Sequence, residues 1–209
     1  MTKRVMLCLC SGYSGESQAF REDGEAWTVI RIDDSSEVCK ENPGTLQYDV
    51  KSWIDWIDRL PRNIDLVWAS PPCGEFTTAG KRPSKPDMSI LLACKEIIDH
   101  LKPRHWIIEN VRGARKFFQP MLGGVPQVIG PFWFWGVFPH LAVHVERKGK
   151  LKQRIGGRLE WCANPDGHWL FNGVRFDKWE TPQNATIPYV ISSALYDGVM
   201  NQMTLGDFP

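Results

Sequence analysis

Several features that define other protein classes are missing from this chain of 209 residues. It has no apolar run of about eighteen residues, so we expect no membrane-spanning helix. The predicted strand after Met1–Arg4 is only about six residues long, which is too short for the apolar centre of a signal peptide. No internal repeat or low-complexity linker divides the chain. We therefore expect one domain of ordinary globular composition, located in the cytoplasm.

The six cysteines lack the spacing of a disulfide framework or a metal site. No Cys-x-x-Cys pair occurs, and Cys162 and His168 have no further ligands at the spacing that zinc requires. Cys8 and Cys10 alternate along one predicted strand, so we expect them to point the same way. Cysteines without such a framework are typical of a reducing compartment. The pattern favours an intracellular protein without a bound metal.

Charge is balanced over the whole chain, at +1, but unevenly distributed. Residues 1–60 hold 7 of the 25 basic and 11 of the 24 acidic residues. Two basic clusters follow later in the chain, and neither contains an acid: Lys81, Arg82 and Lys85, and then Arg147, Lys148, Lys150, Lys152, Arg154 and Arg158. Each cluster alone is as consistent with a solvated loop as with a binding surface. Together they favour a polyanionic partner, because phosphate neutralisation dominates nucleic-acid affinity.

Strands and helices alternate through the first half, which predicts an α/β fold with a mostly parallel sheet and helices on both faces. Strands are expected at 5–9, 27–32, 46–50, 65–70 and 105–108, and helices at 16–22, 53–60, 88–101 and 187–200. After residue 112, glycines and prolines break the chain into short pieces around Phe132–Trp135. Residues 141–183 predict a small, irregular β insert.

Two of these strands end in side chains that can do chemistry. Pro72 and Cys73 follow the strand at 65–70, and Glu109 directly follows the strand at 105–108. Ligands and catalytic groups of open α/β sheets gather outside the carboxyl ends of the strands. A thiolate nucleophile and a carboxylic acid that donates a proton near neutrality are therefore predicted to face one pocket.

The first strand-to-helix turn lacks the Gly-x-Gly-x-x-Gly pattern of dinucleotide-binding proteins. Ser11–Gly15 is nevertheless a glycine-containing turn that could approach a ligand closely. Asp33, at the end of the second strand, is placed to accept both hydroxyls of a ribose. Asp49 could accept from an adenine amino group or simply start a helix, and the sequence leaves both open.

These motifs together resemble the carbon-5 cytosine methyltransferases that use S-adenosylmethionine. Leu9–Gly15 is similar to the family's cofactor loop, Pro72-Cys73 to its catalytic Pro-Cys, and Glu109–Val111 to its Glu-Asn-Val motif. Thr186–Leu195 resembles the C-terminal helix that returns beside the cofactor loop. The resemblance implies a Rossmann-like methyltransferase fold, and its cofactor-binding residues would be Cys10, Ser11, Gly12, Tyr13, Ser14, Gly15, Asp33, Asp49, Ser70 and Pro72.

The resemblance also implies a mechanism. Cys73 would attack carbon 6 of a flipped cytosine while Glu109 contacts ring nitrogen 3, and a methyl group would then be added at carbon 5. The family's Gln-x-Arg-x-Arg segment, whose arginine supports the cytosine carbonyl, has no clean match. Arg154 and Arg158 have the right residue type with altered spacing, and Arg112 and Arg115 are rivals for that role.

The expected organisation is a catalytic domain of residues 1–140 plus 184–209, with residues 141–183 as a reduced target-recognition insert. This compact layout is similar to phage or prophage members of the family, which would act in a bacterial host or phage-infected cell. Double-stranded DNA is the expected partner, contacted through Lys81, Arg82, Lys85, Arg147, Lys148, Lys150 and Lys152, and the protein is expected to be a monomer. Three alternatives remain: the same chemistry on RNA, alkyl transfer from a modified sulfonium cofactor, and a non-catalytic nucleic-acid-binding module.

Overall fold

The computed structural model describes residues 2–76, 85–148, 168–171, 174–176 and 186–202, and one large sheet organises them. Its strands are β1 (Arg4–Leu9), β2 (Trp27–Asp33), β3 (Thr45–Gln47), β4 (Leu66–Ala69), β5 (His105–Val111), β6 (Gln127–Ile129) and β7 (Phe132–Val137). They lie in the order β3-β2-β1-β4-β5-β7-β6. The first five run parallel, and β7 is antiparallel to both its neighbours. This confirms the predicted Rossmann-like α/β fold with a mostly parallel sheet.

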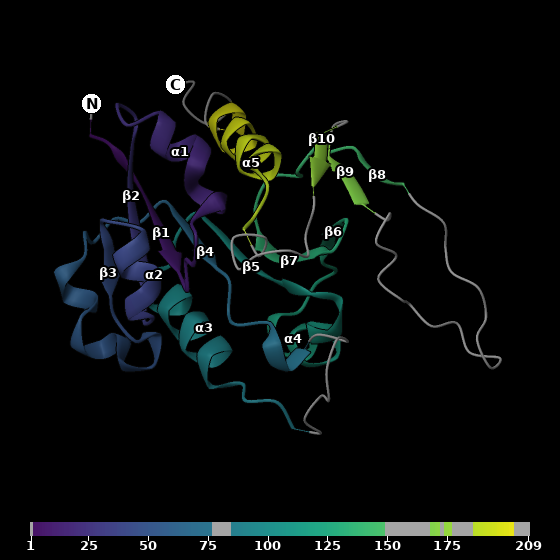
Figure 1. Cartoon of the computed structure of the whole chain (residues 1–209). Helices are drawn as coiled ribbons and strands as arrows, with labels where there is room; N and C mark the ends of the chain where they lie inside the picture. The colour runs from purple at the N-terminus through teal and green to yellow at the C-terminus, as the bar shows by residue number, and fades with distance from the viewer. Residues whose placement is uncertain (1, 77–84, 149–167, 172–173, 177–185, 203–209) are drawn as a thin grey trace.

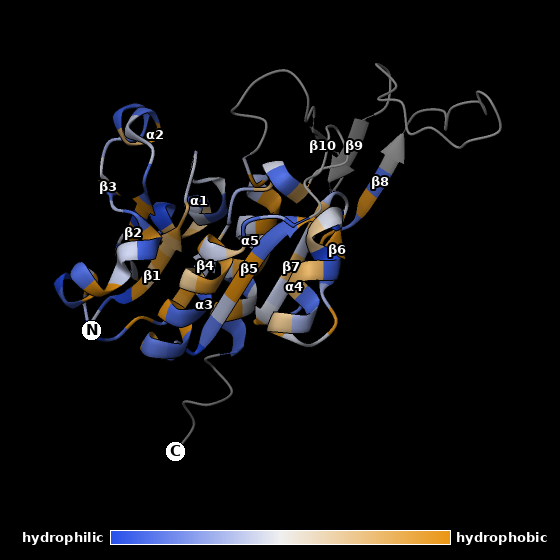
Figure 2. Ribbon diagram, turned by 90° about the horizontal axis from the view of Figure 1, so that it is seen from below, coloured by the Kyte–Doolittle hydropathy of each residue, from blue (hydrophilic) through white to orange (hydrophobic). Residues whose placement is uncertain are grey.

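Helices cover both faces of this sheet (Figure 1). One face carries α1 (Gln18–Glu22), preceded by the 3₁₀ turn η1 (Gly15–Ser17), and α5 (Tyr189–Gln202). The other carries α3 (Ser89–Leu101) and α4 (Arg115–Leu122), together with the 3₁₀ turns η2 (Val50–Asp55) and η3 (Ile57–Arg59). The short helix α2 (Ser36–Glu41) connects β2 to β3 and buries no residue. Most of its residues are hydrophilic, in contrast to those of the central strands (Figure 2).

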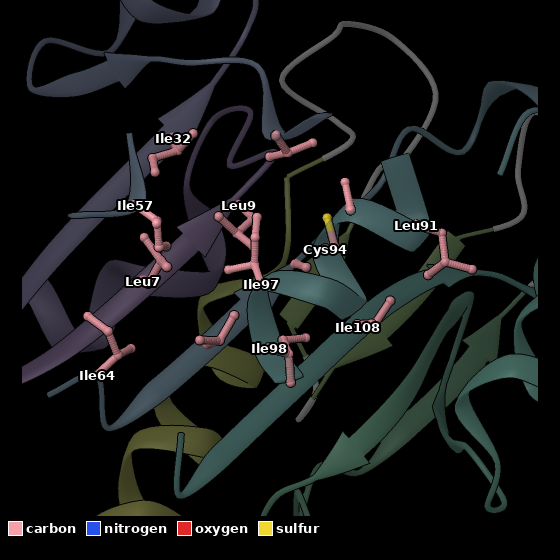
Figure 3. Close-up of a cluster of buried hydrophobic side chains, with 14 of the residues drawn as sticks. Leu7, Leu9, Ile32, Ile57, Ile64, Leu91, Cys94, Ile97, Ile98 and Ile108 are labelled. Carbon is pink, nitrogen blue, oxygen red and sulfur yellow. The ribbon is translucent and has the colours of Figure 1, made fainter. Parts of the chain in front are cut away.

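The alternation of side chains along β1 divides the core into two layers. Leu7 and Leu9 belong to the cluster on the α3 face, where Leu9 lies beside Ile97 and Leu7 lies near Ile57 (Figure 3). Met6 and Cys8 point to the other face, into the cluster formed with α1 and α5. A strand that is buried on both faces requires a continuous apolar run, and this is the pattern by which β1 and β4 are recognised in the sequence.

A second, antiparallel sheet contains β8 (Val145–Lys148), β9 (His168–Phe171) and β10 (Val174–Phe176). It falls within residues 141–183, for which the sequence predicts β structure. Residues 149–167, 172–173 and 177–183 of that insert lie outside the described part of the chain. No described helix is both long and apolar enough to cross a membrane.

The prediction of an α-helix over residues 53–60 is wrong. The chain forms two short 3₁₀ turns there, and Trp56 between them has φ −127° and ψ −13°. That break changes the direction of the side chains on either side of it. Ile57 and Leu60 are buried as predicted, but Ile54 is 73% exposed.

The helix α4 has no counterpart in the sequence-based assignment, because Pro120 lies inside it. Proline removes one backbone donor and normally ends a helix. Here it falls in the last turn, where Gly123 N–H still donates to Gln119 O at 2.9 Å. Burial of Phe118 against Trp135 fixes the helix on the sheet despite the proline.

Candidate active site

The parallel pairing of four strands stops at the same level, at one edge of the sheet. Ile32, Leu9, Ala69 and Ile108 are in register across β2, β1, β4 and β5. Neighbouring strands lie about 4.8 Å apart, so Leu9 of β1 and Ile108 of β5 are separated by roughly 10 Å. The loop at 10–15, Asp33 at the end of β2, the Pro-Cys turn and Glu109 therefore all lie at this edge. The structure brings these predicted groups together.

The loop at 10–15 is bent by alternating left-handed residues. Cys10, Gly12 and Ser14 have φ values of 52°, 47° and 60°. Left-handed conformations at non-glycine residues cost of order 1–3 kcal/mol and cluster at ligand sites. The Ser14 N–H donates to Ser11 O at 2.8 Å, which closes the turn. The side chains of Ser11 and Ser14 are buried, and neither hydroxyl has a hydrogen-bond partner among the described residues.

The left-handed Cys10 also corrects one prediction. Cys8 and Cys10 do not point the same way, because β1 ends at Leu9 and the chain reverses its side-chain direction there. Cys8 packs among α1 and α5, whereas Cys10 packs on the opposite face. A hydrogen bond with Cys94 and burial raise the pKa of the Cys10 thiol. Both thiols are therefore structural.

Asp33 joins the loop to the end of β2. Its Oδ2 accepts the Gly12 N–H at 2.9 Å, and its Oδ1 accepts the Ser35 N–H at 3.0 Å. Only 9% of the residue is exposed. A carboxylate offers about four acceptor positions, so each oxygen can still receive one more donor. The arrangement suits a ligand that presents two neighbouring hydroxyls.

Asp49 lies near Asp33, because the Tyr48 N–H donates to Asp33 O at 3.1 Å. The Asp49 carboxylate accepts the Lys51 N–H at 2.9 Å and caps the turn η2. The residue thus starts a helical turn, as one of the two sequence interpretations has it. A role toward adenine stays a prediction.

The Pro-Cys turn is short and anchored at both ends. The Ser70 N–H donates to Leu9 O at 3.1 Å, and the Ser70 hydroxyl accepts from Trp68 Nε1 at 2.8 Å. After the exposed Pro72, Cys73 is half-buried. Its carbonyl accepts the Phe76 N–H at 2.9 Å, closing the 3₁₀ turn η4 (Gly74–Phe76). The thiol is consequently displayed on a constrained loop at the edge of the sheet.

Asn110 belongs to the Glu-Asn-Val motif, but it is assigned no role in the site from the sequence. It is buried beside the half-buried Glu109 at the end of β5. Its Nδ2 donates to Pro71 O at 2.8 Å, and its Oδ1 accepts the Val111 N–H at 2.9 Å. The amide therefore fixes the turn that carries Cys73 to the strand that carries Glu109. A polar residue within a buried strand end was the available signal.

The chain's C-terminal segment covers the loop, as the resemblance implies. A Cβ atom on Gly15 would lie 2.2 Å from Ile187 O and 2.3 Å from Thr186 Cγ2, so only glycine fits. From α5, the Ser192 hydroxyl donates to Glu16 O at 2.8 Å and accepts the Ala19 N–H at 3.1 Å. The loop is thereby clamped between β1 and α5.

Glu16 is the second residue that sequence reasoning missed. It is 3% exposed, and burial raises its pKa to about 7. The Cys8 thiol donates to its carboxylate, while the charges of Arg21 and Arg31 oppose the upward shift. Oε1 has no partner among the described residues. An acidic residue in the first turn of a helix is normally exposed, so the sequence alone does not indicate that Glu16 is buried.

The residues predicted to bind nucleic acid are only partly described. Lys85 is exposed, and Arg147 and Lys148 lie on β8. Arg112 and Arg115, the alternative supports for a cytosine carbonyl, are exposed just beyond β5. Six further predicted residues lie outside the described part of the chain: Lys81, Arg82, Lys150, Lys152, Arg154 and Arg158. Cys162, rejected above as a zinc ligand, also lies outside the described part of the chain.

Comparison with known proteins gives consistent matches. The "Probable DNA (cytosine-5)-methyltransferase" of Frog virus 3 (isolate Goorha) is 30% identical over 101 residues, which cover 41% of this chain and 44% of that protein. A solved structure from an E. coli prophage, provisionally described as a DNA modification methyltransferase, aligns with a TM-score of 0.46 and 19% identity, over 65% of this chain and 47% of that one. The Entamoeba histolytica methyltransferase EhMeth aligns with a TM-score of 0.44 and 15% identity, over 77% of this chain and 57% of that one. The chain spans roughly half the length of these proteins.

Residues 7–119 match the family described as C-5 cytosine-specific DNA methylase. This match covers more than half of the chain and runs from β1 through α4. It contains the loop at 10–15, Asp33, Cys73 and Glu109, which the sheet brings to one edge. The chain therefore belongs to the C-5 cytosine-specific DNA methylase family.

Proposed function

We propose that this protein methylates carbon 5 of cytosine in DNA, with S-adenosylmethionine as the methyl donor. The observation that carries the proposal is that Cys73 and Glu109 both follow the level at which the pairing of the adjacent strands β4 and β5 stops. The ligand-type loop of β1 lies on the other side of β4, at the same edge. A nucleophile, a carboxyl group and a cofactor loop thus share one edge of the sheet.

The residues at the end of β1 and β2 fit S-adenosylmethionine. The buried hydroxyls of Ser11 and Ser14 lack partners among the described residues, and they could donate to the carboxylate of the methionine part. Asp33 would accept the ribose hydroxyls, and Asp49 would accept the adenine amino group. Contacts with the proposed loop residues Cys10, Gly12, Tyr13 and Gly15, and with Ser70 and Pro72, would complete the site. The bound cofactor supplies an electrophilic methyl group.

The chain's own residues then perform covalent catalysis. The Cys73 thiolate forms a bond to carbon 6 while Glu109, protonated, donates a hydrogen bond or proton to ring nitrogen 3. The electron pair of the carbon 5–carbon 6 double bond becomes available at carbon 5, which takes the methyl group. Loss of the carbon 5 proton to a base restores the double bond and expels the Cys73 thiolate. The cytosine must leave the duplex stack to reach this edge, so base flipping is part of the proposal.

The division of labour along the chain is also proposed. Residues 1–140 and 184–209 would form the catalytic domain, closed by the contact between Gly15 and the C-terminal segment. Residues 141–183, with the sheet of β8, β9 and β10, would form a reduced insert that reads DNA. Arg154 or Arg158 of the insert, or Arg112 or Arg115 of the catalytic domain, would support the cytosine carbonyl.

Nucleoside mass spectrometry tests the proposal. Purified protein with S-adenosylmethionine should form 5-methylcytosine in DNA, and Cys73→Ala should abolish the product. Cys39→Ala removes a half-buried thiol from α2 and should leave the product intact. If the product forms only in RNA, the substrate is RNA and not DNA. If the added alkyl group is heavier than methyl, the cofactor is a modified sulfonium compound. If neither nucleic acid is modified although S-adenosylmethionine binds, the catalytic proposal is wrong and a binding module remains.

A further inference from the structure

The start of α4 forms a cationic surface next to the sheet edge that carries Cys73 and Glu109, here called the catalytic edge. The proposed function assigns no role to this surface as a whole. Arg112, in the 3₁₀ turn η5 (Arg112–Ala114), and Arg115 and Lys116, in α4, are all exposed. From Asn110 to Val145 the sequence contains no aspartate or glutamate. None of the three cations forms an ion pair within the described residues. Their charges are therefore not neutralised by the described protein around them.

Aromatic rings hold two of these cations in place. The Arg115 guanidinium lies over the Trp133 ring at 5.6 Å, and the Lys116 ammonium lies over the Phe117 ring at 4.5 Å. The Arg115 Nε also donates to Gln119 Oε1 at 2.9 Å. Such contacts orient a long cationic side chain while leaving donors directed to solvent. The cations are thus positioned before any partner arrives.

The surface is attached rigidly to both catalytic elements. Trp133 is paired with Asn110 across β7 and β5, so the ring under Arg115 lies at the end of the strand that carries Glu109. Phe117 and Phe118 of α4 contact Phe76, with ring centres 5.7 and 5.1 Å apart. Phe76 closes the turn that displays Cys73. The cations are therefore held at a fixed position relative to both Cys73 and Glu109.

The opposite end of the sheet has the reverse charge. Residues 1–60, which form β1, β2 and β3 and their connections, hold more acidic than basic residues, 11 against 7. A polyanion that approaches the catalytic edge is consequently repelled from the β3 side and attracted toward α4. The charge distribution and the positioned cations both favour a phosphate backbone lying across α4.

We propose that Arg112, Arg115 and Lys116 form a phosphate-binding surface that holds the DNA backbone flanking the target cytosine beside Cys73 and Glu109. The inference rests on the proposed function and adds a DNA contact within the catalytic domain, separate from the insert at 141–183. Phosphate contacts fix the position and register of a duplex without reading its sequence. The surface would thus supply affinity and orientation, and target choice would lie elsewhere.

The test is the salt dependence of DNA binding by the triple variant Arg112→Gln, Arg115→Gln and Lys116→Gln. Each phosphate contact contributes about 0.9 to the slope of log affinity against log salt, so losing three should lower that slope by about 2.7. The control triple is Arg62→Gln, Lys102→Gln and Arg104→Gln. It removes equal charge near the amino ends of β4 and β5. Fluorescence anisotropy with a cytosine-containing duplex, over several salt concentrations, measures both.

A lower slope in the α4 triple, with the control triple close to wild type, supports the proposal. Equal slopes in all three proteins, or equal losses in both triples, would overturn it. Loss of turnover with an unchanged slope would also overturn it and would instead make Arg112 or Arg115 a contact of the cytosine itself. Retained binding of S-adenosylmethionine shows that a variant is folded. If the triple variant does not fold, the single variant Lys116→Glu replaces it in the same measurement. A wild-type protein that methylates neither DNA nor RNA and binds no DNA at low salt would refute the proposed function and this surface together.

Discussion

At the scale of single residues, the buried polar groups Asn110 and Glu16 are the least expected features. Both belong to segments whose sequence reveals the element but not the burial of the side chain. Asn110 has both ends of its amide satisfied within the protein, and Glu16 has one oxygen without a partner among the described residues. We therefore predict that Asn110 positions the proposed nucleophile and that Glu16 makes the stability of the fold depend on pH.

Replacing Asn110 with alanine should slow methyl transfer. The variant leaves Pro71 O without its buried donor, which costs about 1–3 kcal/mol, and frees the Cys73 turn from β5. A displacement of about 1 Å at the nucleophile is enough to cost about a hundredfold in rate. We expect kcat to fall at least tenfold while the Kd of S-adenosylmethionine stays within about twofold. Asn42→Ala removes a similar amide-to-carbonyl bond, to Val38 O in α2, and is the matched control. Equal activity of the two variants would remove the positioning role.

Glu16 should make the protein less stable as pH rises. Its pKa is about 7 in the folded chain against 4.5 ordinarily. Between these values the unfolded chain has lost the proton and the folded chain has kept it, so raising the pH favours unfolding. At about 1.4 kcal/mol per pKa unit, the cost reaches about 3 kcal/mol above pH 7. Urea unfolding at pH 5 and pH 8 should show a larger loss in wild type than in Glu16→Gln. An identical loss in both proteins would contradict the buried, ionising carboxyl group.

At the scale of elements, the sequence identifies those whose pattern is simple. The strands β1, β2, β4 and β5 and the helix α3 are found at the predicted places, because apolar runs and a helical stripe allow one interpretation each. The turns η2 and η3 are misassigned, since 3₁₀ and α spacing differ little over eight residues. The helix α4 is missed, because its stability comes from Phe118 packing on Trp135, a contact that local sequence does not display.

The contact between η1 and the residues before α5 predicts that the single methyl group added by Gly15→Ala destabilises the fold. Gly15→Ala would place a Cβ 2.2 Å from Ile187 O, so the C-terminal segment must shift. Overpacking of this kind typically costs about 1–3 kcal/mol. Chemical denaturation should show this loss, and calorimetry should show weaker S-adenosylmethionine binding. Gly24→Ala, whose nearest atom would be 3.7 Å away, should change neither. Wild-type stability of Gly15→Ala would show that the clamp yields easily.

At the scale of the whole molecule, the order of functional groups along the chain predicts the edge at which they meet. Parallel strands bring Asp33, Cys73 and Glu109 together by topology alone, so this part of the site follows from the sequence. The charge asymmetry between the two ends of the sheet is also visible in the sequence. What holds the parts together, namely Asn110, Phe76 and the Gly15 contact, depends on pairs of residues far apart in the chain.

Binding at this edge should stabilise the whole fold. Ligand at about a hundred times its Kd adds about 2.7 kcal/mol, which for a domain of this size raises Tm by about 5–10 °C. We expect S-adenosylmethionine to produce that shift in wild type and Asp33→Ala to lose it. Asp34→Ala, the exposed neighbouring acid, should retain it. A shift preserved in Asp33→Ala, measured by differential scanning fluorimetry, would exclude Asp33 as a cofactor ligand.

The clamp on the loop after β1 has a consequence for biosynthesis. Gly15 is translated more than a hundred residues before Ile187 and Ser192, which cover the turn that follows it. Strands β1 to β5 can assemble on the nascent chain while the turn is still uncovered. We therefore expect the proposed cofactor site to be completed in one late step, when α5 docks. A chain stalled before that point would carry Cys73 and Glu109 in place without a complete site for the proposed methyl donor.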